Sequence, residues 1–198
     1  LHNYRFLITS PDFRTAVVHC LWFAIPFALL PTVVGLLVAT AIHEYVVPRF
    51  GQAPAGIMRA TLYLPQVVPV SISGLLWLAI LDKSGLVNQL LESTGHAGAQ
   101  RNWLMEPRSA QLWLAVIMFW LQLGYTTTVF VAGSARIDTR LYEAAELDGA
   151  NWWQRFRAVT LPQLRPEVLV VSLTTVIGAL KVFAPVYWIT GGGPIGST

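Results

Sequence analysis

The sequence predicts an all-α, polytopic membrane protein with four transmembrane helices in one domain, 1–198. Three observations predict this class. Apolar residues make up 55% of the chain and charged residues 12%, about half the charged share of a soluble domain. Three runs without Asp, Glu, Lys or Arg, at 15–43, 60–81 and 109–135, are each longer than the roughly 20 residues that an α-helix needs to cross a bilayer. A fourth apolar run, 168–189, contains one charge, Lys181.

The first two spans are expected at about 16–42 and 60–81, and each contains two prolines. In lipid, prolines inside a helix are tolerated where neighbouring helices or hydroxyl groups satisfy the freed carbonyls, so we expect kinked helices packed in a bundle. A short connecting loop with charged residues is expected between them, at 43–59. Its His43-Glu44 pair is not a zinc-protease motif, because Val47 stands where the second histidine would be, and no other metal-ligand spacing is present.

The third and fourth spans are expected at about 110–133 and 168–189. The segment before the third span, 82–108, reads as a loop with a short helix around 86–91. The segment between the two spans, 136–166, is polar but ordered, and we call it the polar loop. Asp138 or Thr139 caps a helix that Asp148-Gly149 ends, and a second helix begins near Asn151 and finishes near Leu161 because of Pro162.

The polar loop carries a specific spacing. Glu143-Ala144-Ala145 is followed after three residues by Gly149, and after nine more by Val159-x-Leu161-Pro162. This pattern resembles the EAA loop of the permease subunits of bacterial ABC importers, with valine where isoleucine is usual. Leu64-Pro65 with Pro69, Trp77, Gly85 and Asn88 is a second, weaker match. The segments 141–145, 148–150 and 190–194 are similar to the corresponding segments of the maltose, trehalose and glycerol-phosphate permeases, which form one branch of this family.

The resemblance implies how the chain is powered. The polar loop would be cytoplasmic and would dock its first helix on an ATP-binding cassette subunit through Glu143, Ala144, Ala145, Gly149, Leu161 and Pro162. ATP and Mg²⁺ would bind to that partner, since the chain has no phosphate-binding loop of its own, and we expect no cofactor, no catalytic residue and no enzyme activity. Members of the branch have about six spans, so a first and a last helix would lie outside these residues.

The same resemblance implies a bacterial cytoplasmic (inner) membrane protein with a second permease subunit, expected as a heterodimer, and an extracytoplasmic solute-binding protein. The basic residues are scattered between apolar runs, which predicts contact with the lipid bilayer and not with nucleic acid. Segments 43–59 and 136–166 together carry seven arginines, against five basic residues on the other side, so the positive-inside rule also favours a cytoplasmic polar loop.

Helix geometry predicts which residues line the pathway of the sugar. Trp120 and Thr127 share a face of the third span, and Gly178, Lys181 and Trp188 share a face of the fourth. A charge within a span is costly unless it faces a wet cavity, pairs or reaches the interface, so Lys181 is either a pathway residue or a snorkelling one. Two alternatives stay open: a permease for an amino acid, polyamine or phosphate, and a membrane scaffold subunit.

Overall fold

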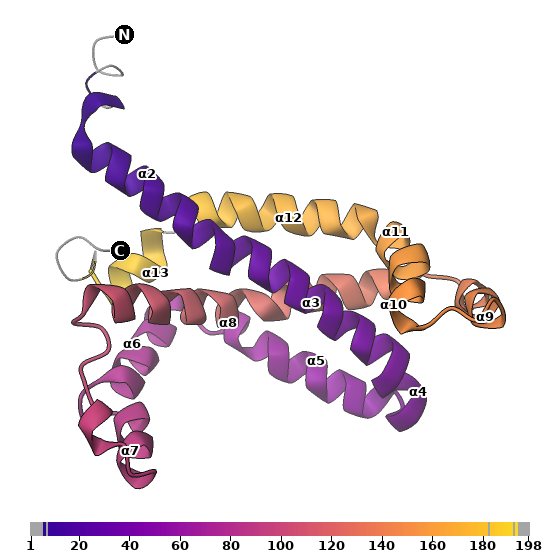
Figure 1. The fold of residues 1–198 in the computed structure, drawn as a ribbon, viewed down its shortest axis with the longest axis horizontal. Helices are drawn as coiled ribbons and strands as arrows, with labels where there is room; N and C mark the ends of the chain where they lie inside the picture. Colours follow the sequence, from indigo (N-terminus) through magenta and orange to yellow (C-terminus); the bar gives the residue numbers. More distant parts are fainter. Residues whose placement is uncertain (1–5, 7, 182, 192, 194–198) are drawn as a thin grey trace. The chain divides into compact units, whose positions relative to one another are not determined.

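The computed structural model describes residues 6, 8–181, 183–191 and 193, which form helices and turns with no strand among them (Figure 1). The predicted all-α class is therefore confirmed. Gly192 and Pro194, which belong to the 190–194 similarity, lie outside the described residues. The helices group into two compact units: unit 1 is Leu1–Ala28, Val68–Trp120 and Val176–Thr198, and unit 2 is Leu29–Val67 and Leu121–Thr175.

Unit 1 is built from short helices. It contains α2 (Pro11–Ala24), most of the π-helix η1 (Ile25–Leu29), α6 (Val70–Leu81), α7 (Leu86–Ser93), the 3-10 turn η3 (Ala97–Ala99), the first half of α8 (Pro107–Ser134), the end of α12 (Arg165–Leu180) and α13 (Phe183–Ile189). The short helix expected around 86–91 is α7. Helix α13 packs on α6, where a Cβ atom on Gly74 would lie 3.4 Å from the Ile189 side chain.

Unit 2 contains the remaining helices. They are α3 (Leu30–Ala41), the π-helix η2 (Ile42–Val46), α4 (Val47–Phe50), α5 (Gln52–Val67), the second half of α8, α9 (Thr139–Leu147), α10 (Trp152–Arg155), the π-helix η4 (Phe156–Thr160), α11 (Leu161–Gln163) and most of α12. The chain doubles back between α4 and α5 at Gly51, whose φ of 81° favours glycine (Figure 1).

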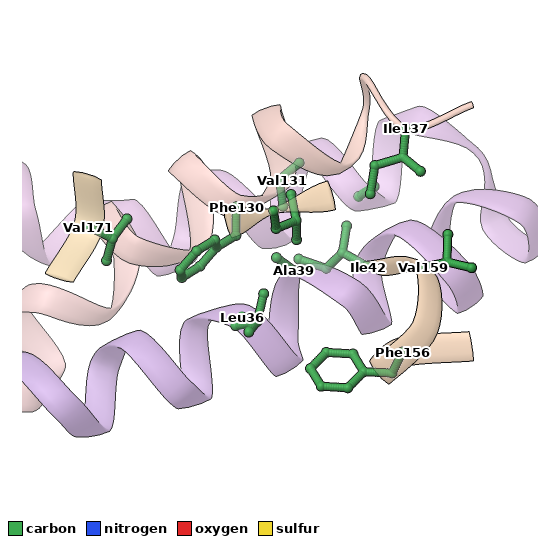
Figure 2. Close-up of a cluster of buried hydrophobic side chains, with 11 residues drawn as sticks. Leu36, Ala39, Ile42, Phe130, Val131, Ile137, Phe156, Val159 and Val171 are labelled. Atoms are coloured by element: carbon green, nitrogen blue, oxygen red, sulfur yellow. The ribbon is translucent and has the colours of Figure 1, made fainter. Parts of the chain in front are cut away.

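One hydrophobic core holds unit 2 together (Figure 2). Its buried side chains come from α3, η2, α5, α8, the polar loop and α12: Leu36, Ala39, Ile42, Ala55, Phe130, Val131, Ile137, Phe156, Val159, Leu164 and Val171. Helices α8 and α5 touch backbone to backbone at Gly124, where a Cβ atom would lie 2.2 Å from the Leu62 carbonyl oxygen. Only glycine permits that approach, as is common where membrane helices pack.

Three helical stretches are long and apolar enough to cross a membrane: Phe13–Phe50, Val70–Ser93 and Pro107–Ser134. A fourth candidate is the pair Trp152–Gln163 and Arg165–Leu180, which is bent by 72°. The first stretch continues through 43–50, which we expected to be a loop. The rest of the expected loop, 52–59, forms the start of α5, so the loop prediction is wrong for 43–59 except at Gly51. His43 and Glu44 are half-buried against other elements of unit 2, which stabilises the helix there.

Two expected spans differ from the helices observed. The span at 60–81 is divided, because Pro69 is the N-cap of α6 in an extended conformation and cannot donate a backbone hydrogen bond to continue α5. The span at 168–189 is also divided: α12 ends at Leu180, Lys181 lies in a turn, and α13 begins at Phe183. The shared face proposed for Gly178, Lys181 and Trp188 therefore does not exist, since one helix does not carry all three.

Candidate functional site

The first helix of the polar loop has a well-defined start and end. Asp138 is its N-cap, with its carboxylate accepting a 3.0 Å hydrogen bond from the Arg140 N–H. Gly149 ends it with a φ of 75°, and the Ala150 N–H donates back to the Ala145 carbonyl at 2.9 Å. This pattern closes the C-terminus of α9 as the Asp148-Gly149 signal predicts.

The second helix of the polar loop begins at a capping box. The Asn151 side chain accepts from the Gln154 N–H at 3.0 Å, and the Gln154 side chain accepts from the Asn151 N–H at 2.7 Å. The helical path then continues through η4 to Gln163, two residues beyond the end that we expected at Leu161. Pro162 fits because it follows a π turn, in which the Leu161 N–H reaches back to the Phe156 carbonyl.

Helix α9 is attached to the core by one of its faces. Tyr142 and Ala145 pack against the buried cluster of unit 2. The Tyr142 hydroxyl shares a 3.0 Å hydrogen bond with the Thr160 hydroxyl on η4. Burial raises the pKa of the Tyr142 phenol, so this hydroxyl is uncharged at neutral pH. The orientation of α9 is therefore fixed by contacts on its inner side.

The opposite face of α9 is free in the described structure. Glu143, Ala144 and Gly149 are exposed, and the Leu147 residue is 90% exposed. Two of the residues predicted for docking, Leu161 and Pro162, lie on α11, where Leu161 is 37% exposed and Pro162 is half-buried. Ala145 does not face outward as predicted, because it lies on the core side of the helix. Leu147 was missed, although an apolar residue between Glu146 and Asp148 on a polar helix is a visible signal.

An ionic group also lies behind α9, and sequence reasoning did not find it. Arg155 Nη1 lies 2.6 Å from Glu146 Oε1 on α9, and its Nη2 lies 4.0 Å from Glu44 Oε2 in η2. Arg136 pairs with Glu167, a buried residue on the first turn of α12. These pairs join segments that are far apart in the sequence, so spacing along the chain gives no sign of them.

Of the predicted pathway residues, Trp120, Gly178, Lys181 and Trp188 belong to unit 1, and Thr127 belongs to unit 2. Trp120 lies in an aromatic run in unit 1, where its ring meets Trp77 edge to face at 5.6 Å, and Trp113 contacts both Trp77 and Trp103. Thr127 is 1% exposed, on the stretch of α8 that belongs to unit 2. Trp120 thus contacts other tryptophans of unit 1 and Thr127 is buried in unit 2, and the pathway role of both stays a prediction.

The remaining pathway candidates lie in different local surroundings within unit 1. A Cβ atom on Gly178 would lie 2.6 Å from the Phe27 ring, so this glycine permits close packing of α12. Lys181 is exposed in the turn that follows α12. Trp188 is half-exposed on α13 and contacts Tyr187 edge to face. None of the five lines a cavity of about 290 Å³ in unit 1 whose lining residues are Leu78, Asp82, Asn102, Leu104, Met105, Ile189, Thr190 and Gly193.

Asn88, named above only as part of the weaker match, organises the loop that precedes α8. Its residue is 1% exposed, and its amide nitrogen donates to the carbonyls of Asp82, Lys83 and Arg101 at 2.8 to 3.1 Å. Its amide oxygen accepts from the Trp103 indole at 3.0 Å. One side chain thus pins the loop to α7.

Groups that could hold a metal ion are missing from the described part of the chain: no three His, Cys, Asp or Glu residues there lie close enough together.

Comparison with known proteins gives consistent matches. Residues 32–198 match the family model described as "Binding-protein-dependent transport system inner membrane component". The trehalose/maltose transport system permease protein of Thermococcus litoralis is 34% identical over 199 aligned positions, which cover 100% of this chain and 65% of the relative. The lactose transport system permease protein of Rhizobium radiobacter is 34% identical over 146 positions, covering 73% of this chain and 49% of the relative.

The fold is also found in a solved structure. A bacterial ABC transporter involved in the import of the acidic polysaccharide alginate matches with a TM-score of 0.78 and 24% identity, over 92% of this chain and 62% of that chain. The chain thus spans 65% or less of the length of these relatives.

Proposed function

The chain belongs to the family of binding-protein-dependent transport system inner membrane components, and on this premise we propose that it is a permease subunit of an ATP-driven ABC importer. In this role it forms part of the transmembrane pathway for a sugar that an extracytoplasmic solute-binding protein delivers. The relatives named for trehalose, maltose and lactose support a carbohydrate as the solute. The polar loop lies in the cytoplasm of a bacterial cell, and the helices lie in its inner membrane.

The outer face of α9 is the observation that carries this proposal. It presents Glu143, Ala144 and Leu147 to solvent, while its inner face is fixed to the core by Tyr142 and Ala145. An apolar side chain that is 90% exposed on a fixed helix is suited to a groove on a partner, because helices dock by inserting apolar anchors. Burying Leu147 contributes about 1.5 to 3 kcal/mol to such a complex.

The energy for transport comes from the partner that holds α9. ATP and Mg²⁺ bind on the ATPase subunits, and the permease binds no cofactor and carries no catalytic residue. Closure of two ATPase subunits around ATP moves α9 of this chain and the corresponding helix of a second permease subunit. The helix bundle then changes between two packings, of which ATP binding favours one.

The test is the affinity of the assembled permease for its ATPase. The full-length permease pair, in detergent or nanodiscs, is titrated with the ATPase subunit as wild type and as Leu147→Ser. We expect binding to weaken by about 10- to 100-fold, which follows from the burial energy of one leucine. Met105→Ser is the matched control, because Met105 is 71% exposed in the loop before α8. Equal affinity of wild type and Leu147→Ser would refute docking through α9.

A further inference from the structure

Arg155 connects two parts of unit 2 that are about a hundred residues apart in the sequence. Its guanidinium contacts Glu146 on α9 at 2.6 Å and approaches Glu44 in η2 at 4.0 Å. The three side chains differ in exposure: that of Glu146 is 60% exposed, that of Arg155 19% and that of Glu44 10%. The group therefore runs from the surface, at α9, to Glu44, which lies within the long stretch Phe13–Phe50.

Glu44 depends on this arginine. Among the described residues, neither of its carboxylate oxygens has a hydrogen-bond partner within ordinary limits, although the Trp152 indole and the Thr160 hydroxyl lie beside it. A buried carboxylate is costly unless a charge pairs with it. At 4.0 Å, Arg155 supplies the charge without a hydrogen bond. Movement of the guanidinium toward Glu44 by about 1 Å would complete one.

The backbone at both ends of this contact is not a regular α-helix. Glu44 lies within the π-helix η2, and Arg155 is the residue immediately before the π-helix η4. Each π-helix is followed by a proline, Pro48 or Pro162, which removes a backbone donor. Single π turns inside α-helices are frequent at functional sites, since their hydrogen bonds are less regular than those of the α-helix.

We infer that Arg155 is a positioning residue that transmits displacement of α9 to the stretch Phe13–Phe50. Its guanidinium is shared between Glu146 on the docking helix and Glu44 on the transmembrane helix. When α9 is displaced, Glu146 carries Arg155 with it, and the distance from Arg155 to Glu44 changes. The Arg155–Glu44 interaction energy then differs between the two packings of the bundle. Such a difference lets displacement of α9 shift the populations of the two packings. The inference rests on the proposed docking of α9 to an ATPase.

The test uses the assembled transporter with full-length subunits in proteoliposomes. Arg155→Gln, Glu44→Gln and the double variant are compared with wild type, and Arg157→Gln is the matched control because its guanidinium lies over the exposed Trp153 ring, 5.9 Å from the centroid. Two quantities are measured: co-purification of the ATPase subunit, and ATP hydrolysis with and without solute-loaded binding protein. We expect co-purification to persist and the stimulation by solute to fall about 2- to 30-fold in each single variant. The double variant should lose no more than either single one.

A further variant separates positioning from folding. Arg155→Lys keeps the positive charge between Glu146 and Glu44, so it should retain more of the stimulation than Arg155→Gln. Additive losses in the double Gln variant, or stimulation equal to that of Arg157→Gln, would overturn the inference. A wild-type transporter whose ATPase neither binds nor responds to solute would overturn the proposed function instead.

Discussion

Gly149 offers the sharpest test of how α9 is held. Its φ is 75°, and a Cβ atom there would meet nothing within 4 Å. The Cβ atom of Gly149→Val therefore meets no neighbour, and the effect expected is the cost of placing a β-branched residue in the left-handed region. That cost is about 2 kcal/mol, which lowers the equilibrium constant for forming the native turn about 30-fold. Because the turn joins α9 to α10, docking to the ATPase should weaken by up to the same factor.

The assay is titration of the assembled permease with its ATPase, combined with solute-stimulated ATP hydrolysis. Gly95→Val is the matched control, since Gly95 has a φ of 82° and nothing within 4 Å, but lies in the loop after α7. Gly149→Asn should keep most of the affinity, because asparagine tolerates the left-handed region. If Gly149→Val binds and stimulates as wild type does, or if Gly95→Val weakens docking equally, the turn does not orient the docking helix.

Three further predictions concern packing and the pathway. Asn88→Ala removes the hydrogen bonds that pin the loop before α8 and should lower the stability of the detergent-solubilised protein by about 2 to 4 kcal/mol in thermal unfolding. Gly124→Ala places a methyl group against an α5 carbonyl and should cost about 1 to 3 kcal/mol in the same measurement, whereas Gly56→Ala, which meets nothing within 4 Å, should cost little. Trp120→Ala tests the predicted pathway role: loss of sugar flux with unchanged thermal stability would support it, whereas a loss of stability with flux retained would assign Trp120 to packing against Trp77.

Local signals in the sequence were sufficient for the caps and the turn of the polar loop. Asp138, Gly149 and Asn151 act through backbone groups within a few residues of themselves, so their capping roles follow from residue type and position. The all-α class followed from composition and from the length of the charge-free runs. These features depend on short-range geometry or on total hydrophobicity, and neither requires knowledge of which helices touch.

The parts that were missed depend on contacts between distant segments. Ala144 and Ala145 are neighbouring residues of the same type. Only the position of the core shows that Ala145 faces inward and Ala144 faces outward. Arg155 and Glu44 are both ordinary loop charges in the sequence, and the ion pair exists because the polar loop folds back on η2. The pathway role of Gly178 stays a prediction, and only the fold shows that its Cα lies close to the Phe27 ring. Helical periodicity places such residues on a face without saying what that face meets.

The prolines show most clearly why helix ends were misplaced. We expected Pro162 to end a helix, because its ring clashes with the carbonyl four residues earlier. In the structure Pro31, Pro48 and Pro162 each come two residues after a π-helix, η1, η2 or η4, and the helical path continues through all three. A π turn reaches back five residues instead of four, which displaces the obstructing carbonyl and leaves the proline without a donor to satisfy. A proline in an apolar run therefore predicts a widened turn as readily as a helix end, and the choice between them is made by neighbouring helices. The π-helix η4 is an example: its residues Phe156 and Val159 are buried in the core of unit 2, and this packing favours the widened turn before Pro162 over a helix end.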